Sequence, residues 1–248
     1  MAGIGTGYDL SVTTFSPDGR VFQSEYAQKA VDNAGTAAGI RCKDGVVLAV
    51  EKLVVSKMLV GGSNRRIAPV DRHAGLATAG LAPDGRQILN RAQAEATNYK
   101  SFHGGPIPGH VLNERLSSYK HLFNLYWSVR PYGCTTLLAV ADRDGPALYV
   151  VEPSGVSHRY FGAAVGKGRQ QARTEIERLK LGEMTCREGV KELAKIVHRV
   201  HEEEKPFELE MGWICEESGM EFQKVPADLL AEADSAAKAA LDDSDMED

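Results

Sequence analysis

The chain has 248 residues, of which 43% are hydrophobic and 25% charged, as in an ordinary globular domain that is long enough to bury a sizeable core. The formal net charge is −5, but residues 231–248 alone hold seven acidic residues and one lysine. The rest of the chain is therefore nearly neutral and offers no basic surface for a nucleic acid. No apolar run approaches the length of a membrane span, so we expect no transmembrane helix and no membrane contact.

The first predicted element is an extended arm over residues 1–15, which hold three glycines and show little periodicity. The stretch Ser16-Pro17-Asp18-Gly19 is a strong turn signal. After it, the apolar spacing predicts a helix over about residues 20–33, and Gly35 can end that helix.

The remaining elements are predicted from apolar periodicity and turn residues. They are strands at 36–42, 46–51, 67–70 and 74–80, helices at 83–100 and 108–129, strands at 135–141, 147–152 and 158–161, helices at 167–181 and 186–204, strands at 207–216 and 220–225, and a last helix from about residue 227.

The order of these elements predicts the fold class. Neighbouring strands joined by short turns imply antiparallel sheets, and paired helices must bury an apolar stripe against them. Two sheets between two helix layers satisfy both requirements, in a layered α/β (α+β) fold. We expect one domain over residues 1–230, followed by residues 231–248 as an acidic, solvated tail.

The cysteines Cys42, Cys134, Cys186 and Cys215 are far apart and form no Cys-x-x-Cys pair. They predict buried, reduced thiols in a cytosolic or nuclear protein, not a disulfide framework or a zinc site. The N-terminal residues lack a basic stretch followed by an apolar one, so we expect no secretory signal.

Two further patterns are weak evidence for a site. Residues 162–168 resemble a phosphate loop, but they have one residue too few between the glycines, and Gly168 stands where a Mg²⁺-binding hydroxyl is needed. A helix start is the preferred interpretation. His198 and His201 do not have the spacing of a zinc protease. We expect no metal and no cofactor.

A capping box at Thr185 and Glu188 predicts a helix start.

Three stretches resemble the signatures of proteasome α-type subunits, and the resemblance runs from Gly5 to the last helix. The matching residues are Gly7-Tyr8-Asp9, Thr14 to Arg20, Phe22-Gln23 and Glu25-Tyr26-Ala27, then Lys43 to Lys52, and finally Arg130 to Cys134 and Glu152 to Gly155. Leu10 stands where most members carry Arg. Together with the acidic tail, it favours one subunit type within the family.

This resemblance implies the four-layer αββα sandwich of the N-terminal nucleophile hydrolase superfamily. It also implies a subunit of an outer seven-member ring in the cytoplasm and nucleus, working in ubiquitin-dependent protein degradation. The implied partners are other α-type subunits, β-type subunits, and a regulatory particle or other activators. Contacts that run head to tail and close after seven rotations can make such a ring.

The resemblance further implies that the chain is not an enzyme. Catalytic members of the superfamily use an N-terminal threonine, whose own amine acts as the base. Gly35 falls at that position and has no hydroxyl. Glu51 and Arg66 fall near the acid and the lysine of catalytic relatives, and arginine is a poor acid–base group. Two alternatives stay open, a peptidase processed to begin at Thr36 and a stand-alone binding module.

The arm acquires a role from the same resemblance. In the family, such arms converge over the axial pore and exclude substrates. Tyr8 and Asp9 match residues that form a cluster with Pro17 and Tyr26 when the gate opens. The tyrosine hydroxyls and the carboxylate can form hydrogen bonds, and proline fixes the turn. The alternative is that Pro17 and Tyr26 only cap and pack the first helix.

A second implied surface receives the C-terminal carboxylate of an activator protein. Arg66 matches the cation of that pocket, and Gly80 and Leu81 match its wall. Capture of a carboxylate by a cation is a standard recognition mode. Arg65 is an alternative cation, and Arg66 on a solvated strand end is the other interpretation.

Ser244 is a candidate phosphorylation site, because the acidic residues after it suit an acidophilic kinase. The alternative is a solvated terminus without a regulatory role.

Overall fold

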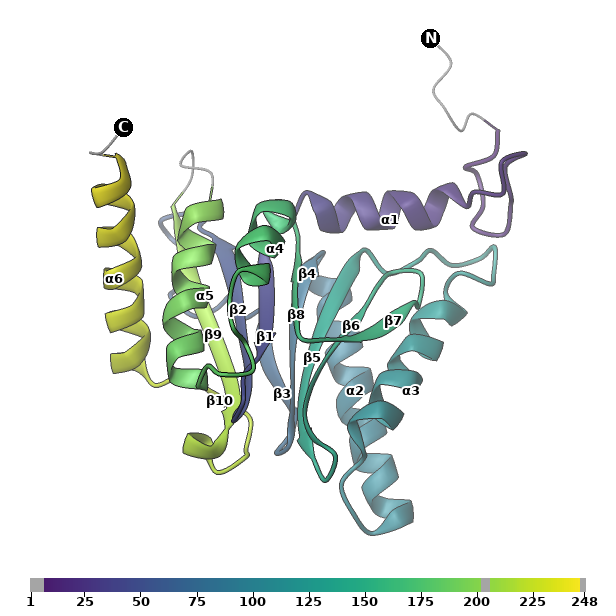
Figure 1. Cartoon of the computed structure of the whole chain (residues 1–248). Coiled ribbons are helices and arrows are strands. Elements are labelled where there is room, and N and C mark those ends of the chain that lie inside the picture. The colour runs from purple at the N-terminus through teal and green to yellow at the C-terminus, as the bar shows by residue number, and fades with distance from the viewer. Residues whose placement is uncertain (1–6, 202–205, 246–248) are drawn as a thin grey trace.

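The computed structural model of the chain describes residues 7–201 and 206–245, with side chains as far as Leu241. It is a sandwich in which two antiparallel sheets face each other and helices cover both outer faces (Figure 1). The elements are α1 (Phe22–Asp32), β1 (Ala37–Arg41), β2 (Gly45–Leu53), β3 (Ile67–Asp71), β4 (Ala74–Gly80), α2 (Ala82–His103), α3 (Gly109–Leu122), β5 (Cys134–Asp142), β6 (Gly145–Val151), β7 (Ser157–Tyr160), β8 (Gly162–Val165), α4 (Arg169–Glu177), α5 (Cys186–Val200), β9 (Phe207–Cys215), the short 3₁₀ helix η1 (Glu216–Ser218), β10 (Gln223–Lys224) and α6 (Ala227–Asp245).

Each sheet has five strands, ordered β10-β9-β2-β1-β8 in one and β3-β4-β5-β6-β7 in the other. The turn at residues 43–45 makes the predicted hairpin, in which Arg41 pairs with Val46. β2 and β4 are buried along almost their whole length, because each has a sheet on one side and helices on the other. The core between the sheets includes Leu48, Leu137 and Leu148, all fully buried.

The helices lie where the apolar stripes predict. α4 and α5 cover the first sheet and α6 packs against α5, α2 and α3 cover the second sheet, and α1 crosses one end of the sandwich (Figure 1). α5 begins with the predicted capping box. Glu188 N donates to Thr185 Oγ1 over 3.3 Å, and Thr185 N donates to Glu188 Oε2 over 2.8 Å. The predicted layered fold is confirmed. In the described part of the chain, no helix is both long and apolar enough to cross a bilayer.

Helix α3 is shorter than predicted, because it ends at Leu122 and not near residue 129. The Asn124 side chain donates to the carbonyl oxygens of Lys120 and Pro153, at 3.1 and 3.0 Å, and accepts from the Ser24 hydroxyl at 2.7 Å. A short polar side chain that bonds to backbone groups offers an alternative to helical hydrogen bonding. The tertiary contacts of Asn124 thus accompany a helix end that periodicity did not predict.

Strand β8 was not predicted. Residues 162–165 form an edge strand that pairs with β1, with Ala164 opposite Ala38, and α4 begins only at Arg169. Glycine and alanine have weak strand propensity, so only the pairing with a neighbouring strand makes this segment a strand.

The predicted boundary at residue 231 is not a structural boundary, because it falls inside the continuous helix α6. Leu229, Ala233 and Ala237 are buried in the same core as the apolar face of α5. The packed domain therefore extends at least to Ala237, and the acidic residues Glu232 and Asp234 lie on this helix, not in a separate tail.

Candidate functional site

A cavity of about 300 Å³ lies where α1, β2 and β4 end. Arg66, Gly80 and Leu81, the three residues expected to bind a carboxylate, all line it. The Arg66 Nη1 atom donates to the carbonyl oxygen of Gly80 over 2.7 Å. The structure therefore brings the three predicted docking residues together in one hollow.

Gly80 is required by its backbone conformation and by its surroundings. Its φ is +114°, which L side chains rarely adopt, and a Cβ atom there would be 2.2 Å from the carbonyl oxygen of Gly133. The next residue, Leu81, precedes α2, and its N–H donates to the same oxygen over 2.9 Å. This close approach of two backbone segments shapes the cavity wall.

The guanidinium of Arg66 has no carboxylate partner among the residues that the structure describes, whereas the other cation of the cavity does. Lys52 Nζ lies 2.9 Å from Glu208 and 4.0 Å from Glu210. Burial lowers the pKa of Arg66, and the charge of Glu210 opposes that effect. Arginine stays protonated at neutral pH, so the cavity holds a partly desolvated positive charge that an anion can neutralise.

Arg65 occupies a different environment. Its side chain is exposed and lines a neighbouring hollow with Arg86 and Leu89, and it does not line the cavity that Gly80 and Leu81 share. Arg66 lines both hollows, whereas Arg65 lines only the second one, so only Arg66 shares a cavity with Gly80 and Leu81.

Position 35 lies in the wall of the same cavity. A Cβ atom at Gly35 would be 2.5 Å from the carbonyl oxygen of Glu51, so any larger residue requires the backbone to shift. The neighbouring residue, Thr36, is buried, and its Oγ1 accepts the N–H of Gly168 over 3.1 Å. Residue 35 is also preceded by α1 in the chain, so its nitrogen is a peptide nitrogen.

Glu51 is held in place by hydrogen bonds. Its Oε2 accepts the N–H of Thr36 over 2.8 Å, and its Oε1 is 2.6 Å from Nδ1 of His201. The other histidine, His198, has Nε2 2.7 Å from Asp234 Oδ1 on α6. The two histidines therefore join structural elements. No cluster of His, Cys, Asp and Glu in the described part of the chain is arranged to hold a metal ion.

Sequence reasoning assigned no role in this cavity to Lys52 or Glu210. Glu210 is buried and accepts the N–H of Arg66 over 2.8 Å. A signal was present, because Glu210 lies among the apolar residues of β9 and a buried carboxylate must find a donor. The identity of that donor depends on the tertiary structure, since 144 residues separate the pair.

The structure brings two of the four predicted gate residues into contact. The hydroxyl of Tyr26 donates to Asp9 Oδ2 over 3.2 Å, and Gln23 Nε2 donates to the Asp9 carbonyl. Desolvation and the bond to Asp9 raise the pKa of Tyr26. Tyr8 and Pro17 are exposed, and the role of Gln23 was not anticipated.

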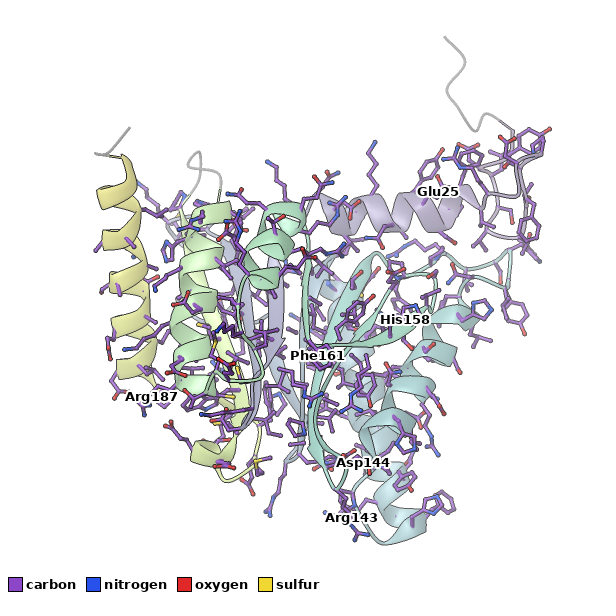
Figure 2. All side chains as sticks on the ribbon, in the orientation of Figure 1. Glu25, Arg143, Asp144, His158, Phe161 and Arg187 are labelled. Carbon is purple, nitrogen blue, oxygen red and sulfur yellow. The ribbon has the colours of Figure 1, made fainter. Side chains whose placement is uncertain are left out.

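The turn that carries Pro17 is well defined. Gly19 N donates to the Ser16 carbonyl over 2.9 Å, and Arg20 N donates to the Ser16 side chain over 3.0 Å. Arg20 also pairs with Glu25, which Figure 2 labels on α1. The arm therefore leaves the domain from a fixed turn, with Tyr8 and Tyr26 partly exposed beside it.

Comparison with known sequences identifies the relatives of this chain. The family described as proteasome subunit matches residues 31–214, and the N-terminal signature of type A proteasome subunits matches residues 8–30. The chain is 65% identical to the alpha type-3 proteasome subunit of Spinacia oleracea and 64% identical to that of Arabidopsis thaliana, over the full length of each. It is 49% identical to the probable alpha type-7 proteasome subunit of Saccharomyces cerevisiae, over 94% of this chain and 83% of the yeast protein.

The N-terminal match includes Tyr8, Asp9, Pro17 and Tyr26, and the longer match includes both sheets up to β9. Two independent sequence signatures and the four-layer sandwich thus agree with each other. The chain belongs to the proteasome subunit family, as one of its α-type members.

Proposed function

We propose that the chain is a non-catalytic subunit of the outer ring of a proteasome core particle, where it helps to gate the entry of substrates and docks activators. The observation that carries this proposal is Gly35. It stands inside the chain, has no hydroxyl, and lies too close to the Glu51 carbonyl to accept a side chain without a backbone shift. A residue in this setting cannot act as an N-terminal nucleophile.

The rival function, a peptidase processed to begin at Thr36, is less compatible with the contacts. The Thr36 hydroxyl already accepts the N–H of Gly168, and its backbone N–H donates to Glu51. Cleavage before Thr36 would also separate the domain from α1, which supplies part of the cavity wall. A hydroxyl in this structural role is poorly placed to attack a substrate.

Docking is supported by the partly desolvated charge of Arg66 beside Gly80 and Leu81, because its guanidinium forms no ion pair with any described residue. Its partner is the C-terminal carboxylate of a regulatory particle or another activator. α1 contacts both surfaces, because Ala30 and Asn33 at its end line the cavity while Tyr26 and Gln23 near its start bind Asp9. When an activator docks in the cavity and shifts α1, the shift therefore also moves Tyr26 and Gln23, which bind Asp9 in the arm.

The gate proposal is tested by Tyr26→Phe in the assembled particle. This change removes the hydroxyl that binds Asp9 but keeps the ring beside Phe22, at a centroid distance of 6.2 Å. We expect about a two- to tenfold change in activator-stimulated peptide hydrolysis, the effect of one lost hydrogen bond. If Tyr26 only packs the helix, the variant behaves like the wild type.

The assembly proposal is tested by native mass spectrometry of the tagged chain from its own cells, with N-terminal sequencing of the same sample. We expect a multi-subunit assembly with other α-type subunits in a seven-member ring and with β-type subunits, in which residues 1–34 are retained. A chain that begins at Thr36 means a peptidase, and an unassembled monomer means a binding module.

We further propose a place in the cytoplasm and nucleus and a role in ubiquitin-dependent protein degradation, as the family resemblance implies. The four buried free cysteines are compatible with a reducing compartment. Phosphorylation of Ser244 remains a proposal, because its side chain lies outside the described residues. Intact-mass measurement of the cellular protein tests it, and the absence of any phosphate would contradict it.

A further inference from the structure

Three of the four cysteines meet at one end of the sandwich, around the turn between β1 and β2. Cys42 follows β1, and its N–H donates to the Gly45 carbonyl over 2.8 Å. Gly45 is the register partner of Cys215 at the end of β9. Cys186 begins α5, and its N–H donates to Asp44 over 2.8 Å. A single turn therefore holds three thiol-bearing segments that are far apart in the sequence.

The three cysteines belong to one buried cluster in the core of the first sheet and α5. Interaction with both Cys215 and Cys42 raises the pKa of the Cys186 thiol. One turn further along α5, a Cβ atom at Gly189 would be 2.8 Å from the Cys42 sulfur, so the helix backbone lies directly on the cluster. All three residues are buried and none forms a disulfide. Cys186 is the central member because it interacts with both of the others.

Cys215 differs from an inert core thiol in its hydrogen-bond donors. Its sulfur accepts the N–H of Ser218, and its own N–H donates to Ser218 Oγ over 3.0 Å, as the cap of η1. The hydrogen bond from Cys186, aided by Ser218 and Glu217 and opposed by burial, lowers the pKa of Cys215 to about 7. Within the pair, Cys215 is therefore the thiol that loses its proton more readily, and Cys186, whose pKa is raised, is the one that keeps it.

Cys134 provides an internal comparison. It is fully buried in the separate core between the second sheet and α2 and α3, where burial raises the pKa of its thiol. The cluster of Cys42, Cys186 and Cys215 lies instead beneath exposed residues at the end of the domain, namely Glu216, Glu217 and Arg187. Figure 2 shows Arg187 at this end of α5. A small local opening is enough to admit an oxidant there.

We propose that Cys215 and Cys186 form an oxidisable dithiol, in which a hydroperoxide oxidises Cys215 and Cys186 then closes a disulfide. This inference does not depend on the proposed gating or docking functions, because it rests on the contacts of the cluster alone.

The chemistry balances with hydrogen peroxide as the only oxidant. The Cys215 thiolate attacks one peroxide oxygen, an S–O bond forms, the O–O bond breaks, and the departing hydroxide takes a proton to become water. The Cys186 sulfur then attacks the sulfenic sulfur. An S–S bond forms, the S–O bond breaks, and the hydroxyl leaves as water with the thiol proton. Two thiols are oxidised by two electrons, and one peroxide is reduced to two water molecules.

The test is peptide mapping of the full-length folded chain after graded exposure to hydrogen peroxide. Remaining thiols are alkylated under denaturing conditions, and peptides are separated without reductant. We expect a linked peptide pair containing Cys186 and Cys215, at peroxide concentrations at least tenfold lower than those that oxidise Cys134. In Cys186→Ser, we expect Cys215 to be trapped by a sulfenic-acid reagent and no link to form.

Two results would overturn the proposal. One is oxidation of Cys215 no more readily than Cys134 in the folded wild type. The other is a link that joins Cys42 and leaves Cys215 reduced. Both readouts use the wild-type chain, so the conclusion does not depend on whether Cys186→Ser folds, and Cys134→Ser serves as the matched variant that keeps the cluster intact.

Discussion

At the scale of single residues, Arg66 and Arg65 carry the same charge but differ in their surroundings. Arg66 lines the cavity with Gly80 and Leu81, whereas Arg65 is exposed beside it. We expect Arg66→Ala to weaken binding of an activator C-terminal peptide to the assembled particle by about 10- to 100-fold, the loss of a charge-assisted hydrogen bond. Arg65→Ala should change the measured Kd less than about twofold, as for an exposed pair. If both variants lose the same affinity, the peptide is attracted by positive charge near the cavity and not by the position of Arg66 within it.

At Gly35, the steric effect of a side chain on stability can be measured separately from any catalytic role of the position. Since a Cβ atom there would be 2.5 Å from the Glu51 carbonyl, Gly35→Ala should destabilise the chain by about 1–3 kcal/mol through overpacking. Gly182→Ala is the matched control, because nothing lies within 4 Å of its Cβ position. Urea unfolding measures both. If Gly35→Ala leaves the free energy of unfolding unchanged, the strand ends can separate to admit a side chain. That result would weaken the steric argument against a nucleophile at this position.

At the scale of elements, a fully buried lysine joins α3 to the second sheet. Lys120 Nζ donates to the carbonyl oxygens of Cys134 and Val151, at 3.0 and 2.8 Å, and contacts Thr136 Oγ1 at 3.3 Å. Burial lowers the pKa of Lys120 to about 8, with partial opposition from the charges of Cys134 and Glu152. The amine is therefore easier to deprotonate in the folded protein than in the unfolded chain.

This shift predicts a pH dependence with a definite sign. Between pH 8 and about 10.4, the usual pKa of lysine, the unfolded chain binds a proton that folded Lys120 has lost, so the contribution of Lys120 to stability rises with pH. The free energy of unfolding of the wild type minus that of Lys120→Met should increase by up to about 1.4 kcal/mol per pH unit across this window. Urea unfolding at pH 7, 8.5 and 10 measures it. A difference that stays flat or falls with pH would show that the folded pKa is not lowered.

At the scale of the whole molecule, α6 completes the core over the first sheet. Leu229, Ala233 and Ala237 are buried there, and no α6 residue beyond Ala237 that has a described side chain is buried. A chain truncated after Leu241 should therefore unfold at the wild-type urea concentration. A chain truncated after Pro226 should lose on the order of 3–5 kcal/mol, because the core beneath the helix is uncovered. Equal stability of the two truncated chains would restore the predicted domain boundary near residue 231.

The sequence by itself determined the family and the identity of most helices and strands, because both depend on residues that are close together in the chain. Apolar periodicity, turn residues and the Thr185 capping box predicted the strands and helices around the two sheets, and the N-terminal signature predicted membership of the α type. The choice of Arg66, Gly80 and Leu81 also came from the sequence, through resemblance, and their shared cavity is compatible with it.

Only the tertiary structure decided features that depend on partners distant in the chain. β8 is a strand because β1 lies beside it, and α3 ends where Asn124 meets Pro153. Glu210 faces Arg66 across 144 residues, and three cysteines that look isolated in the sequence share one turn. Local propensities for these segments are weak or misleading, and their conformation is set by long-range hydrogen bonds and packing that no short window of sequence contains.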